Sequence, residues 1–244
     1  MKILICKDYN EMSLVASNLL AKEIIDKPNT TLGLATGSTP VGLYKNLIEM
    51  NKNNIIDFSQ VKTFNLDEYF GLDKSDTQSY YHFMRDNLFN HININAQNTH
   101  IPSGVAQDIE AECQRYDKLI EDSGGIDIQI LGIGSNAHIA FNEPSDTFKM
   151  GTYLVDLTES TINANSRFFD SIDKVPTKAV TIGVGSIFKA KKIILLASGK
   201  NKAEAIYNTV FGDINPNVPS SILKLHPDVT LVLDKDSSKL INNQ

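Results

Sequence analysis

The sequence predicts a single α/β domain with a Rossmann-like sheet, which is open, twisted and mainly parallel and has helices on both faces. Short apolar runs rich in β-branched residues and leucine recur along the chain, as expected for buried strands. Many of these runs alternate with segments in which apolar residues recur at helical spacing, which favours a parallel sheet. The run 193–196 contains no polar residue, as is typical of a strand covered on both faces.

The expected elements follow in chain order. Strands are expected at 3–5, 32–35, 61–65, 128–131, 180–184, 193–196 and 231–233. Helices are expected at 12–25, 41–50, 80–89, 109–120 and 203–210. The weakly periodic stretch from about 145 to 176 is rich in Ser, Thr and Asn, and we interpret it as a mobile flap over the site. A chain of 244 residues suffices for one sizeable core, so residues 1–244 are expected to form one domain.

The composition argues against several classes of protein. The net charge is -6 and basic residues form no long run, so nucleic acid is not an expected partner. Cys6 and Cys113 lie far apart and outside any C-x-x-C pattern, which predicts neither a disulfide nor a cysteine zinc site and fits a reducing cytoplasm. The apolar run at the N-terminus ends after four residues, too soon for a signal peptide or a membrane span, so no membrane partner is expected.

The loop after the second expected strand has the features of an anion site, and such sites gather at the carboxyl ends of parallel strands. Gly37 allows a positive φ, Ser38 or Thr39 can cap the following helix, and Pro40 suits its first turn. Free N–H groups and the helix dipole would then face an anion, although an ordinary helix cap is the alternative. The glycine spacing and the Lys-Ser/Thr pair of a Walker A loop are missing.

A second pair of cations follows the sixth expected strand. Lys200 and Lys202 lie at a helix start, where positive charge opposes the helix dipole and therefore suggests an anionic ligand. Two solvated surface lysines are the commoner alternative. Both helix starts could converge on one phosphate.

Asp67 and Glu68 follow the expected strand 61–65, at a place where a general base could reach a bound sugar. Strand alternation sends their side chains to opposite sides, so at most one is expected to face the site. An aspartate that caps a helix or forms a salt bridge is the alternative.

The segment 130–144 contains two glycines, Gly132 and Gly134, that allow the backbone to approach a ligand closely. It does not fit a dinucleotide fingerprint, because Ala137 occupies the third glycine position and polar residues precede any helix. NAD is therefore not expected.

His138 lies among glycines and carboxylates near a predicted strand end, and histidine titrates close enough to neutral pH to move protons. Glu143 precedes Pro144, so its extended backbone could turn back to hold the imidazole. A structural histidine is the alternative. The other histidines show no ligand spacing, and no metal is predicted.

Four motifs in this order resemble those of the glucosamine-6-phosphate deaminase (glucosamine/galactosamine-6-phosphate isomerase) family. They are TGSTP at 36–40, FNLDEY at 64–69, HIAFNEP at 138–144 and NSRFF at 165–169. The similarity runs from residue 1 to about 234. The resemblance implies conversion of glucosamine 6-phosphate to fructose 6-phosphate and ammonia in amino-sugar catabolism, by a cytoplasmic enzyme without a cofactor. It also allows a homo-oligomer.

The resemblance also implies a role for individual residues. Asp67 would carry the proton from C2 to C1, His138 would assist opening of the sugar ring, and Glu143 would orient His138. The residues implied to bind the substrate and its phosphate are Thr36, Gly37, Ser38, Thr39, Gly134, Arg167 and Lys202.

The chain departs from the family pattern in three places. Asn136, which belongs to the implied catalytic set, stands where some members carry an aspartate, so it can accept a hydrogen bond from the imidazole but supplies no charge. Ala137 replaces a more usual glycine and is expected to exclude a strongly positive φ. The region of Tyr153 and Asp156 lacks the basic side chains that hold an effector in allosteric relatives, so N-acetylglucosamine 6-phosphate is not expected to activate the enzyme.

Three other interpretations remain. A 6-phosphogluconolactonase-like hydrolase shares the Gly-Ser-Thr-Pro loop, but the residues at 141–144 argue against it. A sugar-responsive regulator would need a DNA-binding module, whereas this chain begins directly with an expected strand at Ile3 and retains Asp67, His138 and Glu143 together. A protein with a purely structural role is the third alternative.

Overall fold

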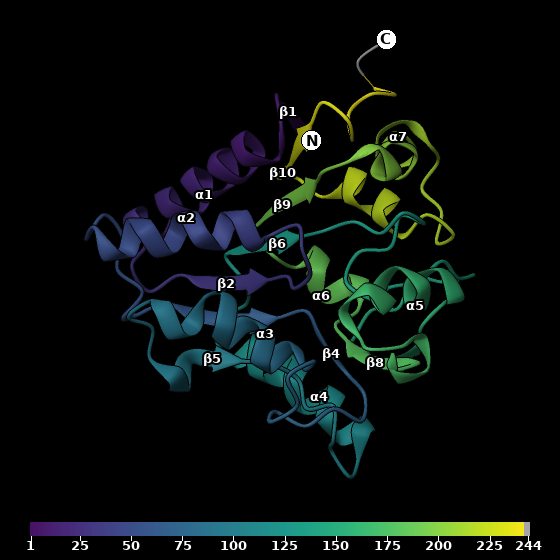
Figure 1. The fold of residues 1–244 in the computed structure, drawn as a ribbon, viewed down its shortest axis with the longest axis horizontal. Helices are drawn as coiled ribbons and strands as arrows, with labels where there is room; N and C mark the ends of the chain where they lie inside the picture. The colour runs from purple at the N-terminus through teal and green to yellow at the C-terminus, as the bar shows by residue number, and fades with distance from the viewer. Residues whose placement is uncertain (242–244) are drawn as a thin grey trace.

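The structure is a computed structural model that describes residues 1–241. Its main sheet has seven strands in the order β1-β10-β9-β6-β2-β3-β5, and all neighbouring strands are parallel (Figure 1). The strands are β1 (Lys2–Cys6), β2 (Thr31–Leu34), β3 (Lys62–Asn65), β5 (Thr99–His100), β6 (Ile128–Leu131), β9 (Lys192–Ala197) and β10 (Val229–Asp234). The expected open, mainly parallel sheet is confirmed.

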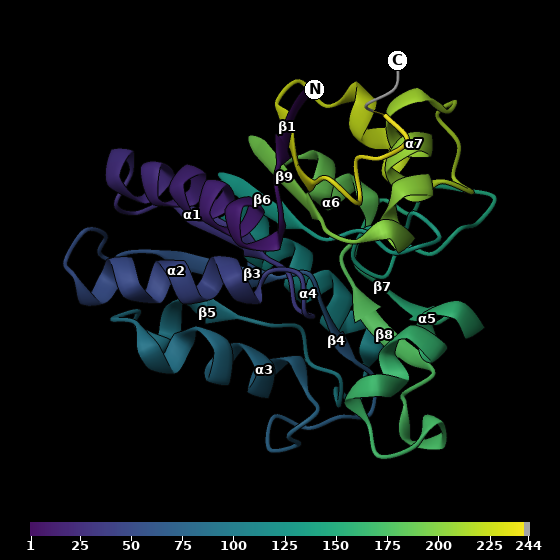
Figure 2. The same ribbon diagram turned by 45° about the horizontal axis from the view of Figure 1, so that its top comes forward.

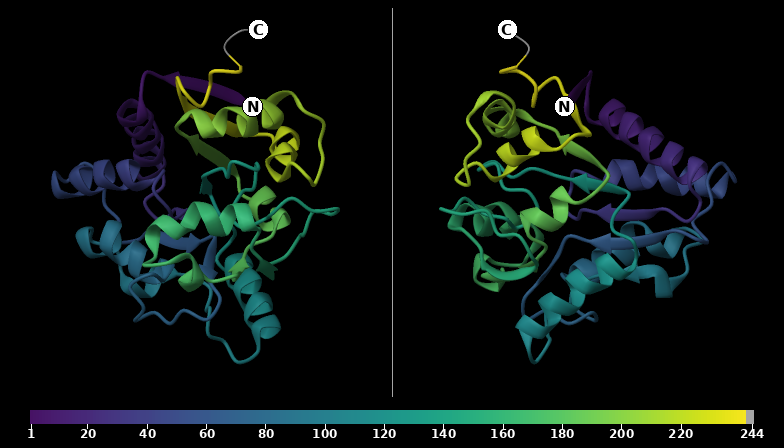
Figure 3. Two further views of the ribbon diagram at one scale, coloured as in Figure 1. Left: turned by 45° about the vertical axis from the view of Figure 1, so that its right-hand side comes forward. Right: turned by 180° about the vertical axis from the view of Figure 1, so that it is seen from behind.

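Helices cover both faces of this sheet. The α-helices are α1 (Tyr9–Asp26), α2 (Val41–Lys52), α3 (Tyr80–Asn87), α4 (Ile109–Asp122), α5 (Glu159–Asn165), α6 (Val184–Phe188) and α7 (Ala203–Phe211). Short 3-10 helices are η1 (Phe89–His91), η2 (Ala96–Asn98), η3 (Ser166–Phe168), η4 (Ile172–Lys174), η5 (Lys200–Lys202) and η6 (Pro219–Leu225). Helices α1, α2 and α3 lie in a row on one face, and α4 and α6 lie on the other (Figures 2 and 3).

This arrangement follows from the handedness of the connections. The chain first runs outward from β2 to β3 and β5, then returns to β6 and moves the other way to β9 and β10. Right-handed crossovers therefore place the helices after β2 and after β6 on opposite faces. A crevice opens at the carboxyl ends of such neighbouring strands, which is where α/β proteins bind ligands.

The core explains why the central strands lack a polar face. Leu34, Ile130, Leu195 and Leu231 are fully buried in β2, β6, β9 and β10. Each strand is covered by helices on both sides, so alternation between apolar and polar residues is lost. No helix within residues 1–241 is both long and apolar enough to cross a bilayer.

A second sheet, of three antiparallel strands, lies beside the carboxyl edge of the first. Its order is β4-β8-β7, with β4 at Asp67–Tyr69, β7 at Tyr153–Asp156 and β8 at Lys178–Thr181. The expected strand at 180–184 is therefore shifted, because the chain pairs with β4 and β7 only to Thr181 and then begins α6.

The stretch interpreted as a flap is more regular than its weak periodicity indicates. It contains β7, α5, η3 and η4, and β7 pairs with β8. Its mobility stays a prediction.

A buried carboxylate joins the amino ends of β2 and β6. Asp127 accepts hydrogen bonds from Lys27 Nζ at 2.6 Å, Lys191 Nζ at 2.7 Å and the Thr31 N–H at 2.8 Å. Burial alone would raise the pKa of Asp127, but the bonds from Lys191, Lys27 and Thr31 outweigh it and lower the pKa to about 2. The ionised carboxylate is therefore a fixed part of this end of the sheet.

The change Asp127→Asn is expected to lower the free energy of unfolding at pH 7 by about 2 kcal/mol, because two lysines lose their buried anionic partner. Folding lowers the pKa of Asp127 from 3.8, so its contribution is present above that pH and is lost as the pH falls toward 2. Urea unfolding at pH 7 and pH 3 measures both effects. The control Asp26→Asn removes an exposed ion pair with Lys22 and is expected to cost less than about 1 kcal/mol. Equal losses in the two variants would contradict the prediction.

Candidate active site

A cavity of ≈ 370 Å³ opens at the carboxyl edge of the main sheet, where β2 and β6 lie side by side. Loops after β2, β3, β6 and β9 form its walls together with α5 and η3. The expected site residues that line it are Thr36, Gly37, Ser38, Thr39, Asp67, Gly134, His138, Arg167 and Lys202. Asn136 and Glu143 do not line the cavity but contact His138 from behind.

The loop after β2 presents backbone N–H groups to this cavity. Gly37 has φ 86°, a conformation that favours glycine. Tyr9 fixes the loop, because its hydroxyl donates to the Ser38 carbonyl at 3.1 Å and accepts from the Gly42 N–H at 2.8 Å. The N–H groups of residues 37–39 donate no hydrogen bond to any residue in the described part of the chain. They are available to an anion.

The expected helix cap at this loop is wrong. Helix α2 begins at Val41 after Pro40, and no side chain caps it. Instead the Ser38 hydroxyl accepts a hydrogen bond from Arg167 Nη2 at 3.1 Å. Ser38 therefore joins the β2 loop to η3, which lies far away in the sequence.

Two cations face this loop. Arg167 comes from η3 and Lys202 from η5, and neither forms a salt bridge with a carboxylate within residues 1–241. Burial, with the nearby charge of Arg167 as a smaller cause, lowers the pKa of Lys202. Two unpaired cations beside free N–H groups make a site suited to a phosphate.

Asp67 faces the cavity from the start of β4. Asp67 is only 5% exposed, and its carboxylate accepts no hydrogen bond from the residues that the structure describes. Burial, and after it the charge of Glu68, raises the pKa of Asp67 well above its ordinary value. Glu68 points the other way, as strand alternation predicts.

His138 is held against a glycine turn. The Gly134 N–H donates to the His138 carbonyl at 2.9 Å, and a Cβ on Gly134 would lie 2.3 Å from the imidazole Cε1. Glu143 turns back so that its Oε2 lies 3.5 Å from His138 Nδ1. Only glycine at position 134 lets the imidazole pack this closely.

Asn136 acts on Glu143 and not on the imidazole. Its Nδ2 donates to Glu143 Oε2 at 2.8 Å, and its Oδ1 accepts from the His138 backbone N–H at 3.3 Å. The Asn136 side chain therefore both donates and accepts a hydrogen bond, and the two bonds fix the turn between His138 and Glu143.

The expectation that Ala137 excludes a strongly positive φ is wrong. Ala137 has φ 68° and Ala140 has φ 51°, both in the left-handed region. Such a conformation costs an alanine roughly 1–2 kcal/mol. Hydrogen bonds hold it in place, since the Ala137 N–H donates to Gly134 and its carbonyl accepts from the Ser220 N–H at 3.0 Å.

Two residues of the site were not predicted from the sequence. Thr161 of α5 has its hydroxyl 3.5 Å from His138 Nδ1, and Tyr80 of α3 lines the cavity. Burial would raise the pKa of Glu143, but His138, Thr161 and Asn136 outweigh it and lower the pKa to about 2. The neighbouring NSRFF motif was the nearest signal for Thr161, whereas no pattern marked Tyr80.

The chain matches a family described as glucosamine-6-phosphate isomerases/6-phosphogluconolactonase over residues 10–232. It belongs to this family. Among curated relatives, the glucosamine-6-phosphate deaminase of Clostridium novyi is 60% identical over 238 residues, covering 98% of this chain and 99% of that one. The protein of the same name from Thermoanaerobacter pseudethanolicus is 58% identical over 244 residues, covering 100% of this chain and 96% of that one.

Solved structures of glucosamine-6-phosphate isomerase/6-phosphogluconolactonase family members show the same fold. A structure described as a monomeric glucosamine-6-phosphate deaminase has a TM-score of 0.96 at 46% identity, covering 98% of this chain and 100% of that one. A 6-phosphogluconolactonase from Trypanosoma cruzi has a TM-score of 0.76 at 21% identity, covering 98% of this chain and 96% of that one.

No group of three or more His, Cys, Asp or Glu that could hold a metal occurs within residues 1–241.

The change Asn136→Asp is expected to lower the free energy of unfolding at pH 7 by about 1–2 kcal/mol, because a carboxylate would replace the donor 2.8 Å from Glu143. Two adjacent carboxylates raise one folded-state pKa, so the loss is expected to shrink as the pH falls to 5. Unfolding of variant and wild type at both pH values measures it.

The control for this change is Asn163→Asp at an exposed position of α5, which is expected to stay within about 0.5 kcal/mol of the wild type. An Asn136→Asp protein as stable as the wild type at pH 7 would show that Asn136 does not support Glu143 in this way.

Proposed function

We propose that the protein converts glucosamine 6-phosphate and water into fructose 6-phosphate and ammonia, as part of amino-sugar catabolism. One observation of the site carries this proposal: the buried Asp67 carboxylate, which accepts no hydrogen bond within residues 1–241, faces a cavity that is also lined by His138 and by two cations without a carboxylate partner in that part of the chain. The relatives that are 58–60% identical over nearly the whole chain are named glucosamine-6-phosphate deaminases. The lactonase structures share little more than the fold.

The phosphate end of the substrate would bind between the β2 loop and the two cations. Arg167 offers a planar pair of donors, Lys202 a point charge, and residues 37–39 their free N–H groups. Among the described residues that line the cavity, Asp67 supplies the one carboxylate. The phosphate group therefore fixes the direction in which the sugar enters.

His138 would assist ring opening. Its imidazole would transfer a proton between the C1 hydroxyl and the ring oxygen, which breaks the bond between C1 and the ring oxygen and leaves an aldehyde. Glu143, whose pKa of about 2 keeps it ionised at neutral pH, orients the imidazole through Nδ1. Asn136 and Thr161 hold Glu143 in place.

Asp67 would carry out the isomerisation. Its carboxylate takes the proton from C2 to give an enolamine and returns that proton to C1, so that C2 becomes an iminium carbon. Water then adds to C2 and ammonia leaves, which gives the ketone of fructose 6-phosphate. The elevated pKa of Asp67 makes it a stronger base than an exposed aspartate.

These steps need no cofactor. The cytoplasmic location and the homo-oligomer stay predictions, and the similar solved structure is described as monomeric.

Asp67→Asn is expected to reduce kcat by about 10³-fold and His138→Ala by about 10²-fold, because each removes a positioned acid–base group. Ammonia and fructose 6-phosphate are measured together after mixing with glucosamine 6-phosphate. Because Asp67 must be ionised, wild-type kcat/KM is expected to fall as the pH drops through the raised pKa of Asp67, well above the range of an exposed aspartate. Absence of both products from the wild type would refute the proposed function.

Lys202→Ala is expected to raise KM about 10- to 100-fold with a smaller change in kcat, because a charge-assisted bond to the phosphate is lost. The matched control is Lys200→Ala, which removes an exposed lysine two residues away. Steady-state kinetics of both variants measure the difference. A similar KM in the two variants would place the phosphate elsewhere.

N-acetylglucosamine 6-phosphate is expected to leave the substrate saturation curve unchanged, since basic side chains are missing from the region of Tyr153 to Asp156. Initial rates across the substrate range, with and without this compound, measure it. A shift of the curve to lower substrate concentration would contradict the expectation.

A further inference from the structure

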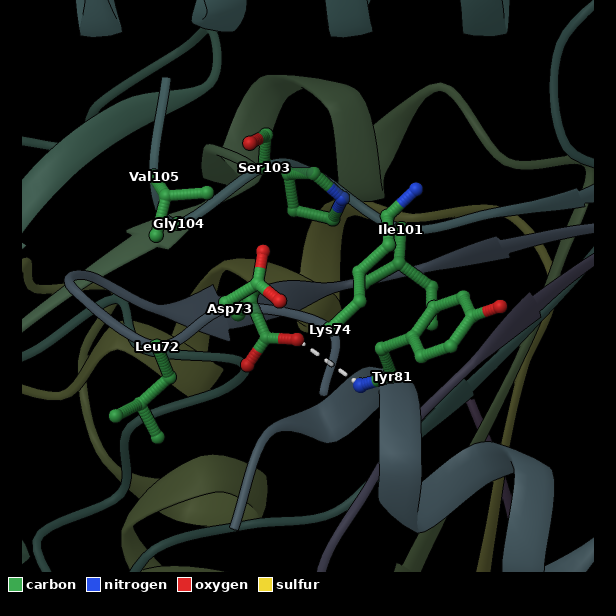
Figure 4. Close-up of a pocket in the computed structure, with 10 residues that line it drawn as sticks. Leu72, Asp73, Lys74, Tyr81, Ile101, Ser103, Gly104 and Val105 are labelled. Atoms are coloured by element: carbon green, nitrogen blue, oxygen red, sulfur yellow. Dashed lines mark hydrogen bonds between the residues drawn. The ribbon is translucent and has the colours of Figure 1, made fainter. Parts of the chain in front are cut away.

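Glu68 is a buried carboxylate that does not face the substrate cavity. It is 3% exposed, and its Oε1 accepts hydrogen bonds from the Tyr69 N–H at 2.9 Å and the Tyr80 N–H at 2.8 Å. Its Oε2 accepts from the Tyr81 N–H at 2.9 Å, the bond drawn as a dashed line in Figure 4. All of these donors are backbone groups.

Two of the donors belong to the first turn of α3. The first N–H groups of a helix have no partner inside the helix and need acceptors from elsewhere. Ser79 supplies one such acceptor, because its hydroxyl accepts from the His82 N–H at 3.1 Å. Glu68 supplies the others from a different element, and its negative charge also suits the positive end of the helix dipole.

The two elements joined by Glu68 each carry a residue of the candidate active site. Strand β4 carries Asp67, and the first residue of α3 is Tyr80, whose side chain lines the cavity. The Tyr80 ring lies 4.7 Å from that of Tyr69 and is stacked 6.1 Å from that of Phe141. The position of the start of α3 therefore sets one wall of the cavity next to Asp67.

We propose that Glu68 is a positioning residue for the reaction: its carboxylate fastens the first turn of α3 to β4 and thereby fixes the gap between Asp67 and Tyr80 into which the sugar must fit. The inference rests on the proposed function. Movement of α3 away from β4 would widen this gap and let water reach the base. A displacement of about 1 Å in such a site is enough to reduce the rate about 100-fold.

The surroundings of Glu68 make this bridge sensitive to pH. Burial raises the pKa of Glu68 to about 7, against the lowering effect of its three N–H donors, and Asp76 adds to the rise. Asp73 and Lys74 are also nearby, because they line a cavity of ≈ 50 Å³ together with Glu68 and Tyr81 (Figure 4). Protonation of Glu68 below neutral pH is expected to weaken its hold on α3.

Asp67 is affected by the same carboxylate. The charge of Glu68 contributes to the raised pKa of Asp67, and the other titratable groups that interact with Asp67 are the phenols of Tyr69, Tyr80 and Tyr116. Loss of the Glu68 charge is therefore expected to lower the pKa of Asp67.

The decisive variant is Glu68→Gln, which keeps the shape but places an amide NH₂ against backbone N–H groups. We expect kcat to fall about 10- to 100-fold, with KM within about threefold because Arg167 and Lys202 lie elsewhere. We also expect the acidic limb of the kcat/KM profile to move to lower pH. Wild-type kcat together with an unmoved limb would overturn the proposal.

Two further variants separate positioning from charge and from stability. Glu68→Asp keeps the charge but is one methylene shorter, so we expect kcat to stay low while the acidic limb stays near that of the wild type. Full recovery of kcat in Glu68→Asp would overturn the positioning role. The matched control is Glu112→Gln, because Glu112 is also buried, accepts the Ser103 N–H at 2.7 Å and pairs with Arg115. We expect it to lower stability without moving the limb, and an equal shift in this control would also overturn the proposal.

Amide hydrogen exchange in the unaltered protein tests the bridge without a variant. The Tyr80 and Tyr81 amides are expected to be protected at pH 8 and to lose protection as the pH falls below about 7, whereas the His82 amide, held by the Ser79 hydroxyl, serves as the internal control. Unprotected Tyr80 and Tyr81 amides at pH 8 would overturn the proposal. This result does not depend on turnover, so a wild type that yields no fructose 6-phosphate would refute the proposed function alone.

Discussion

The burial of two adjacent carboxylates, Asp67 and Glu68, is the constraint on which the rest of the site depends. A buried carboxylate is costly unless its charge is compensated. The structure treats the two differently: Glu68 receives three backbone N–H groups, whereas Asp67 receives none from the described residues. Burial raises the pKa of both carboxylates, that of Glu68 to about 7, but only Asp67 faces the cavity, and it is the proposed base, whereas Glu68 is the proposed anchor of α3.

The cavity brings charged groups of both signs together. Arg167, Lys202 and the N–H groups of the β2 loop that are free within residues 1–241 line it together with Asp67 and His138, and Glu143 lies against His138 without lining it. Topology gathers these groups, because the β2 and β6 loops meet at the point where the chain reverses its direction through the sheet. A substrate with both an anionic group and a reactive carbon is the kind of ligand that suits such a cavity.

Most of the main sheet could be predicted from the sequence because most of its strands contain apolar residues at neighbouring positions, as burial on both faces requires. The run at 193–196 lies within β9 (Lys192–Ala197), and the run at 231–233 lies within β10 (Val229–Asp234). Strand β5 has two residues and β4 has three, too few for any period to show, and they form because neighbouring strands supply partners. Pairing also explains why the strand expected at 180–184 is shifted. Hydrogen bonds to β4 and β7, and not the composition of the strand itself, determine where β8 begins and ends.

In the site too, some features could be predicted from local sequence, whereas others depend on contacts between distant segments. Asp67 and His138, which come from separate motifs, line one cavity, Glu143 lies against His138, and Gly37 adopts the positive φ that its turn requires. Ser38 or Thr39 was expected to cap the following helix, but neither does, and the Ser38 hydroxyl accepts a hydrogen bond from Arg167, 129 residues away. Ala137 adopts a conformation that alanine disfavours, because bonds from Ala137 to Gly134 and from Ser220 to Ala137 hold the turn.

Tyr80 is a further residue of the site whose position depends on a contact with another segment. Nothing in its own segment marks it as part of the site, and it reaches the cavity because a carboxylate twelve residues earlier holds its N–H. The sequence did indicate that Asp67 and Glu68 would point to opposite sides, but helix capping was an alternative only for an aspartate, whereas the structure shows that Glu68 accepts from the first turn of α3. Which helix Glu68 would cap depends on the packing of α3 against β4, and that packing places an aromatic wall beside Asp67, the proposed base.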